Sequence, residues 1–213
     1  MDIQHLNSGI YFILPPDLPT DALLALARAA LAGGVGMLQY REKSKHTRRM
    51  LEEVTRLLEH TRPAGVPLIV NDRVDVAMAC SADGVHLGQE DMPVRAARGI
   101  LGPEIIIGAT TPDSATLHEA EAAGASYVAI GPAFASPTKP EKPVAGIDAI
   151  RRTVREATVP VCAIGGICAE NLPVLVGEGV ALYAVISGIS AARDPETAAR
   201  ELVRIASGEQ PIA

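Results

Sequence analysis

The chain alternates short apolar runs with longer stretches in which hydrophobic residues recur at helical spacing. The apolar runs predict buried parallel strands at 11–14, 37–43, 67–72, 84–87, 105–110, 127–130, 159–164 and 181–186. The stretches between and after them predict helices at 21–32, 47–60, 74–80, 93–101, 113–123, 147–157, 169–178 and 195–206. The pattern therefore consists of eight βα units in succession.

Eight such units joined mostly by short loops predict a (β/α)8 TIM barrel, an α/β fold with right-handed crossovers between parallel strands. The alternative is an open flavodoxin-like or Rossmann sheet, which usually needs fewer units. The first strand is not followed by a Gly-x-Gly-x-x-Gly fingerprint. No linker or low-complexity stretch interrupts the pattern, so we expect a single domain over residues 1–213.

Composition agrees with a barrel and narrows the class of function. Hydrophobic residues make up 48% of the 213 residues but aromatics only 3%, so the core must be built from Val, Ile, Leu and Ala. The formal charge of −6 argues against a nucleic-acid partner, which needs a basic face. We expect no membrane span and no signal peptide. Three cysteines without metal-ligand spacing favour a reducing cytoplasm.

Polar clusters directly follow several of the apolar runs. Gln39, Arg41 and Lys43 alternate along the second predicted strand and therefore face one way, into the barrel mouth. Tyr40 and Glu42 then face the helices. Two cations at such a mouth indicate an anionic ligand, although pairing with local carboxylates would explain them as well.

Two carboxylates follow neighbouring strands. Asn71-Asp72 ends the third predicted strand, and Asp91 comes after the fourth. Carboxylates without His or Cys partners favour a hard cation, and Mg²⁺ is the usual choice beside phosphates. Helix N-capping is the competing explanation for both aspartates. His86, inside the fourth strand, is interpreted as a hydrogen-bonded core residue.

Glycine and hydroxyl residues follow the last strands. Gly165-Gly166 and Ser187-Gly188 each precede a predicted helix after strands seven and eight, where barrels commonly bind a monophosphate. The alternative is ordinary turn punctuation. The long loop 132–146 adds two hydroxyls and a cation in Ser136, Pro137, Thr138 and Lys139. This loop is interpreted as a lid that binds phosphate, or otherwise as a solvated, proline-stiffened segment.

The residues thus predict one monophosphate site and a second anion site with a metal. Arg41, Lys43 and Lys139 would serve the second site with Asp72 and Asp91. A phosphorylated acceptor and a Mg²⁺-bound diphosphate indicate a transferase that releases diphosphate. No Ser/His/Asp or Cys/His arrangement is visible, so we expect no covalent catalysis.

The ordered motifs resemble the thiamine-phosphate synthase family over nearly the whole chain. The segment 39–43 looks like the family's Q-x-R-E-K stretch, which implies a pyrimidine diphosphate held by Gln39, Tyr40, Arg41, Glu42 and Lys43. Asn71-Asp72 resembles the N-D pair, and 83–91 matches D-G-x-H-x-G-Q-x-D. The resemblance implies Asn71 on the same substrate and Mg²⁺ on Asp72 and Asp91.

Later motifs continue the resemblance. Gly131-Pro132 with the loop residues resembles G-P-x-[FY]-x-T-x-[ST]-K, which implies that the loop hydroxyls contact a thiazole phosphate and Lys139 the diphosphate. Gly166 and Ile186-Ser187 match the thiazole-phosphate-binding backbone. Three positions depart from the family pattern: Thr110 replaces the usual serine of a G-x-S-x-H segment, Pro112 replaces its histidine, and Ser136 replaces threonine.

The resemblance implies that the chain joins 4-amino-5-hydroxymethyl-2-methylpyrimidine diphosphate to a thiazole phosphate, giving thiamine phosphate and diphosphate. Arg41, Lys43 and Lys139 would share the stabilisation of the leaving group with Mg²⁺. Two alternatives stay open. One is a thiazole tautomerase, disfavoured by Pro112, and the other is a non-catalytic sensor of a phosphorylated ligand. The expected partners are small molecules, and the sequence leaves open whether the chain forms a homo-oligomer.

Overall fold

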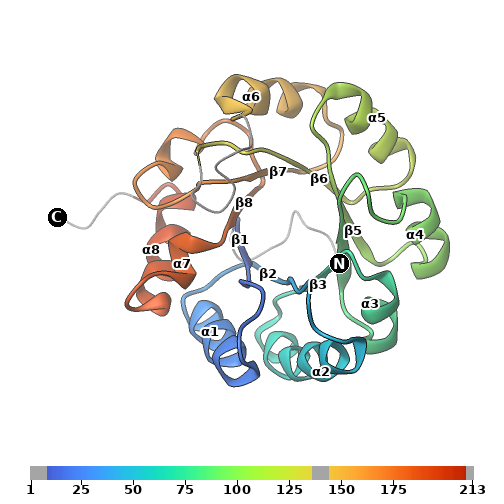
Figure 1. The fold of residues 1–213 in the computed structure, drawn as a ribbon. Helices are drawn as coiled ribbons and strands as arrows, with labels where there is room; N and C mark the ends of the chain where they lie inside the picture. Colours follow the sequence, from blue (N-terminus) through green and yellow to red (C-terminus); the bar gives the residue numbers. More distant parts are fainter. Residues whose placement is uncertain (1–8, 136–143, 210–213) are drawn as a thin grey trace.

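A closed barrel of eight parallel strands forms the centre of the molecule, and helices surround it (Figure 1). The computed structural model describes residues 9–135 and 144–209. The strands are β1 (Ile10–Ile13), β2 (Met37–Tyr40), β3 (Leu68–Asn71), β4 (Gly84–Leu87), β5 (Ile106–Thr110), β6 (Tyr127–Ile130), β7 (Val161–Ile164) and β8 (Leu182–Val185). The helices are α1 (Thr20–Ala32), α2 (Thr47–Ala64), α3 (Val74–Cys80), α4 (Val94–Leu101), α5 (Ser114–Ala122), α6 (Gly146–Glu156), the 3₁₀ turn η2 (Leu172–Val174), α7 (Ser187–Ser190) and α8 (Pro195–Ala206).

The strands pair in chain order, and the barrel closes between its first and last strands. Tyr11 of β1 lies opposite Met37 of β2 on one side and Ala184 of β8 on the other. An open sheet would leave β1 or β8 at an edge. The (β/α)8 prediction is therefore confirmed, and the open-sheet alternative is wrong.

Alternate residues of each strand form two separate apolar layers, as a period of two requires. The barrel interior is filled by Tyr11, Ile13, Met37, Ile69, Ile106, Tyr127, Ala129, Cys162, Leu182 and Ala184. The intervening strand residues, such as Phe12, face the helices and join the larger outer layer. The interior is tightly packed at Gly108, where a Cβ would lie 2.1 Å from the Tyr127 ring.

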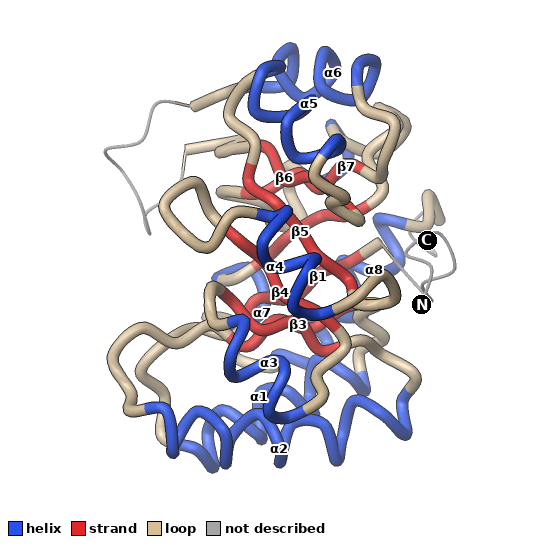
Figure 2. Tube along the Cα trace, turned by 90° about the vertical axis from the view of Figure 1, so that its right-hand side faces the viewer, coloured by secondary structure: helices blue, strands red, loops and turns tan. Residues whose placement is uncertain are grey.

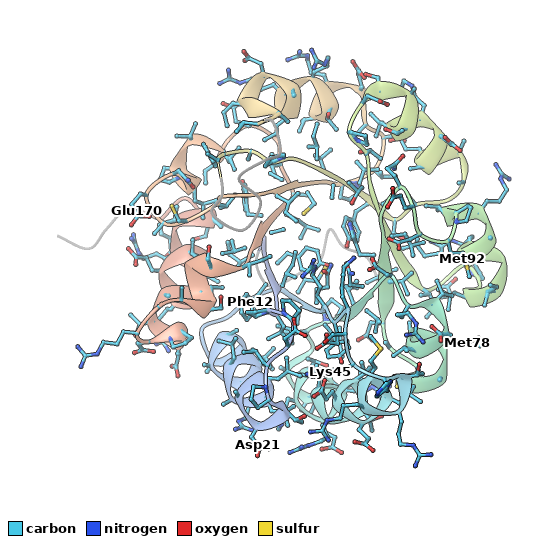
Figure 3. The ribbon with its side chains drawn as sticks, viewed as in Figure 1. Phe12, Asp21, Lys45, Met78, Met92 and Glu170 are labelled. Atoms are coloured by element: carbon cyan, nitrogen blue, oxygen red, sulfur yellow. The ribbon has the colours of Figure 1, made fainter. Side chains whose placement is uncertain are left out.

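Helices cover the outside of the barrel. A view turned by 90° shows the strands between them (Figure 2). Phe12 lies inside the ring of helices, whereas Met78 and Met92 lie at its outer edge beside α3 and α4 (Figure 3). Across residues 9–135 and 144–209, none of the helices combines the length and apolar character needed to cross a membrane.

Two predicted boundaries and one predicted helix need correction. The second strand ends at Tyr40 rather than at residue 43, because the Glu42 carboxylate binds the backbone N–H groups that follow and turns the chain. Helix α2 continues to Ala64, four residues beyond its predicted end. The helix predicted over 169–178 is wrong. Pro173 lacks an N–H donor and Gly177 and Gly179 adopt positive φ, so this segment forms η2 and turns.

Candidate active site

The predicted site residues within the described ranges lie at the carboxyl ends of the strands, which meet at one rim because all eight strands are parallel. In chain order they are Gln39, Tyr40, Arg41, Glu42 and Lys43 at β2, Asn71 and Asp72 at β3, Asp91 after β4, Thr110 at β5, Gly166 after β7, and Ile186 and Ser187 after β8.

Gln39 and Tyr40 face opposite sides of β2, as the sequence predicts, whereas Arg41 and Lys43 lie beyond the end of the strand. Gln39 points into the barrel, where its Nε2 donates a hydrogen bond of 2.5 Å to the Tyr11 hydroxyl. Tyr40 points outwards, and its hydroxyl donates to the Glu53 carboxylate of α2 at 2.8 Å. Tyr40 therefore anchors β2 to the helix layer from outside the barrel.

Glu42 organises the turn after β2. Its carboxylate accepts hydrogen bonds from the backbone N–H groups of Lys43 at 2.7 Å, Ser44 at 2.9 Å and Asp17 at 3.1 Å. Lys45 adds an ion pair at 3.2 Å. Burial by itself would raise the pKa of Glu42, but these donors outweigh burial and lower the pKa to about 2. Glu42 is thus ionised and held in place, and its hydrogen bonds fix the backbone conformation of the turn that carries Arg41 and Lys43.

The two cations of this segment differ in their surroundings. The Lys43 ammonium lies 3.1 Å from an Asp72 carboxylate oxygen and is largely exposed. Arg41 is half-buried, and its guanidinium makes no hydrogen bond or ion pair within residues 9–135 and 144–209. Pairing with a local carboxylate therefore explains Lys43 but not Arg41, whose guanidinium could bind an anion.

Asp72 and Asp91 are close neighbours. Burial raises the pKa of Asp72, the adjacent Asp91 carboxylate raises it further, and Lys43 opposes both effects. Asp91 Oδ2 also accepts a hydrogen bond from the Gly88 N–H at 2.7 Å. Neither aspartate caps a helix, since α3 begins after Arg73 and α4 after Pro93, both without a side-chain cap. The N-cap explanation of these aspartates is therefore wrong.

This carboxylate pair fits Mg²⁺ better than a softer metal. No group of three or more His, Cys, Asp or Glu side chains within the described ranges could hold a metal ion by itself. Mg²⁺ is commonly bound by one or two carboxylates together with water and substrate phosphates. The negative charge of Asp91 disfavours the ionised form of Asp72. A divalent cation bound between the two carboxylates would remove this repulsion.

His86 lies in the barrel interior as a hydrogen-bonded core residue, as the sequence analysis predicts. Its Nδ1 lies 2.9 Å from the Tyr127 hydroxyl and its Nε2 lies 3.0 Å from Thr110 Oγ1. Burial lowers its pKa to about 4, with a smaller opposing effect from Asp91. Sequence reasoning missed Tyr11 and Tyr127, although inward-facing tyrosines in an aromatic-poor chain were a usable signal.

The loops after β7 and β8 lie side by side. A Cβ at Gly188 would lie 3.2 Å from the Ile167 carbonyl oxygen. Gly166 has a φ of +66°, and a Cβ there would lie 2.5 Å from the Ala135 carbonyl oxygen, so glycine is required. Asn171 holds this loop by donating to the Gly166 carbonyl at 2.8 Å. Since no α-helix follows Gly166, the helix N-terminus predicted there is absent from this described segment.

The remaining predicted residues, Ser136, Pro137, Thr138 and Lys139, lie outside the described residues. The chain on either side is held at the rim. Ala133 and Phe134 donate backbone hydrogen bonds to Ile164 and Gly165, and Ala145 donates to Pro132. Both described ends of the loop are therefore beside the exit of β7.

Comparison with known proteins identifies the family. Residues 10–189 match the model of the family described as "Thiamine monophosphate synthase". The chain belongs to this family. The "Thiamine-phosphate synthase" of Chloroflexus aurantiacus is 44% identical over 222 residues, which cover 100% of each chain. The protein of the same name from Natronomonas pharaonis is 45% identical, covering 95% of this chain and 97% of the relative.

Solved structures agree with the family assignment. A "Thiamine phosphate pyrophosphorylase" from Pyrococcus furiosus superposes with a TM-score of 0.85 at 37% identity, covering 95% of this chain and 96% of that one. Some relatives are longer, and the chain spans 55% of the thiamine-phosphate synthase of Thermosynechococcus vestitus. The predicted family and its thiamine phosphate synthesis are confirmed.

Proposed function

We propose that the chain makes thiamine phosphate from the pyrimidine diphosphate and 4-methyl-5-(2-hydroxyethyl)thiazole phosphate by Mg²⁺-assisted dissociative substitution. One observation carries the proposal: Lys43, Asp72 and Asp91 meet at the exits of three neighbouring strands. A cation beside two carboxylates suits a diphosphate that arrives with a divalent metal.

The leaving group is held by the β2, β3 and β4 exits. Asp72 and Asp91 would hold Mg²⁺, which would supply positive charge to stabilise the diphosphate leaving group. Lys43 and Arg41 donate to these oxygens, and Lys139 joins them from the loop. The guanidinium of Arg41 is suited to this role because it has no partner of its own within the described residues.

The pyrimidine ring lies against the inner rim. Gln39, Asn71 and Thr110 hold its polar edge, and Tyr40 and Glu42 support this site from behind. Gln39 and Asn71 are buried at the barrel mouth, which supports such a role. The thiazole phosphate is bound by the backbone of Gly166, Ile186 and Ser187 together with the loop residues Ser136, Pro137 and Thr138.

The reaction needs positioning and charge stabilisation rather than a proton carrier. The bond between the pyrimidine methylene carbon and the diphosphate oxygen breaks, and both electrons leave with the diphosphate. The electron-rich aminopyrimidine stabilises the resulting cation. The lone pair of the thiazole nitrogen then forms the new C–N bond. The chain contributes by aligning the two substrates and by stabilising the departing charge.

A turnover assay with both substrates and Mg²⁺, followed for thiamine phosphate, tests the proposal. Lys43→Ala should mainly weaken use of the pyrimidine diphosphate. Ser187→Ala should act mildly and on the thiazole phosphate, because backbone donors remain. Equal effects of both variants on both substrates would contradict the two-site assignment. The cytoplasmic location and the lack of a nucleic-acid partner stay predictions from composition.

The formation of thiamine phosphate in this assay would exclude a sensor, and a second measurement tests the tautomerase alternative. A tautomerase would isomerise the thiazole carboxylate phosphate without any pyrimidine substrate, which NMR would follow directly. The chain offers Thr110, Thr111 and Pro112 at the exit of β5, none of which titrates near neutral pH. A sensor would bind both substrates without product.

A further inference from the structure

Five polar side chains cross the barrel interior in one unbroken line of hydrogen bonds. Gln39 Nε2 donates to the Tyr11 hydroxyl at 2.5 Å, and the Tyr11 and Tyr127 hydroxyls lie 3.0 Å apart. Tyr127 and Thr110 occupy the two ring nitrogens of His86 at 2.9 and 3.0 Å. The line begins and ends at Gln39 and Thr110, two of the three residues that the proposed function places against the pyrimidine.

We propose that Tyr11, Tyr127 and His86 are positioning residues that fix the direction in which hydrogen bonds are donated along this line, from Gln39 towards Thr110. In that direction Thr110 presents its hydroxyl proton, and Gln39 its amide oxygen, to the aminopyrimidine ring. The inference rests on the proposed function, because it takes the pyrimidine as the ligand at this rim.

The direction follows from counting protons along the line. The Gln39 NH₂ group can only donate, so the Tyr11 oxygen accepts there and uses its single proton toward Tyr127. Tyr127 then donates to Nδ1 of His86, which must be unprotonated. His86 therefore carries its proton on Nε2 and donates to Thr110 Oγ1. The Thr110 proton is left to donate to another acceptor.

A charged His86 conflicts with this geometry. An imidazolium would donate through both nitrogens, so Tyr127 would have to donate to Tyr11. Tyr11 would then accept from both neighbours, and its own proton would have no acceptor, although its side chain is buried. Leaving a buried donor unpaired is unfavourable.

The reversed line is the competing arrangement. It requires the Gln39 amide oxygen to face Tyr11, moves the His86 proton to Nδ1, and makes Thr110 donate to His86. The rim would then offer an N–H donor at Gln39 and only acceptors at Thr110. The two directions therefore predict opposite hydrogen-bonding polarity toward the ligand and opposite tautomers of His86.

The proposed direction suits an aminopyrimidine. An aminopyrimidine carries an amino N–H donor and ring-nitrogen acceptors, which Gln39 Oε1 and the Thr110 hydroxyl complement from the two ends of the line. The role needs only a hydroxyl at the end of the line. Thr110 meets this requirement, and a serine at this position would meet it equally.

The tautomer can be measured without any turnover. The full chain is labelled with ¹⁵N-histidine, and the His86 signals are identified by their loss in His86→Gln. We expect Nε2 with the shift of a protonated nitrogen and Nδ1 with that of an unprotonated acceptor. An Nδ1–H tautomer or an imidazolium at neutral pH would overturn the proposal.

Kinetics test the positioning role. Tyr127→Phe, which deletes one hydroxyl, should raise KM for the pyrimidine diphosphate about tenfold and leave KM for the thiazole phosphate unchanged. The matched control is Tyr183→Phe, which removes the hydroxyl of another strand tyrosine that makes no side-chain hydrogen bond to residues 9–135 and 144–209, and it should leave both constants unchanged.

The coupling is tested with Thr110→Val. The double variant with Tyr127→Phe should bind the pyrimidine diphosphate no worse than Thr110→Val alone, because both changes break the same line. Additive losses, or an equal loss in Tyr183→Phe, would overturn the proposal. A wild-type chain that makes no thiamine phosphate would refute the proposed function and leave the tautomer measurement interpretable.

Discussion

Among single residues, Asp91 gives the most direct test of the metal site. Asp91→Asn removes one carboxylate but keeps an oxygen that can accept from the Gly88 N–H. Turnover should fall more than about 100-fold, since even supporting residues of metal sites contribute 10–100-fold. The melting temperature should not fall, because the like charge beside Asp72 is removed.

The control for this change is Asp21→Asn, an exposed carboxylate on α1 at the outer edge of the molecule (Figure 3). It should leave turnover unchanged. Full activity of Asp91→Asn at limiting Mg²⁺ would show that the metal assignment is wrong.

His86 makes stability depend on pH. Burial lowers its pKa from 6.5 to about 4, so between these values the unfolded chain binds more protons than the folded one. The free energy of unfolding therefore falls as the pH falls. For this group alone the loss between pH 7 and pH 5 should be about 2 kcal/mol. Urea unfolding at both pH values measures it, and an identical pH dependence in His86→Gln would contradict the assignment.

At the scale of elements, the connection from β2 to α2 depends on one buried carboxylate. Glu53 of α2 is fully buried and accepts hydrogen bonds from Tyr40 at 2.8 Å and Lys45 at 3.0 Å. Thr20 of α1 donates to it at 2.5 Å. These contacts join two helices and a strand beneath the Arg41–Lys43 segment.

Glu53→Ala should reduce the free energy of unfolding by about 3 kcal/mol, because it leaves buried partners unpaired. Glu52→Ala is the matched control on the same helix. Glu52 is exposed and pairs only with Arg49 in the described ranges, so its loss should change stability by about 0.5 kcal/mol or less. Chemical unfolding measures the stability of both variants. Equal losses of unfolding free energy would show that the buried cluster contributes no more than the exposed ion pair.

At the scale of the whole molecule, barrel closure depends on close fits in the interior. Gly108→Ala would place a Cβ 2.1 Å from the Tyr127 ring and should cost about 2 kcal/mol or more. Gly99→Ala, in helix α4 with nothing within 4 Å, should instead stabilise the chain by about 0.5–1 kcal/mol. Thermal unfolding compares the two, and similar shifts would contradict the tight fit.

Much of the architecture could be predicted because its signals are local. All eight strands lie within two residues of their predicted positions, except for the carboxyl end of β2. The failures have physical reasons. The end of β2 depends on Glu42 binding backbone N–H groups. The 169–178 segment has alanine and leucine, but it also contains Pro173 and Gly177 and is followed by Gly179, and both glycines adopt positive φ.

The sequence by itself determined the order of βα units, the barrel, the family and the polar residues of the rim, because hydrophobic period and motif spacing are encoded in neighbouring residues. Only the tertiary structure decided which side chains meet across the barrel. Tyr11 and Tyr127 are 116 residues apart in the sequence, yet their hydroxyls form a hydrogen bond with each other. Such a contact depends on the register with which all the strands close, and no local pattern carries that information.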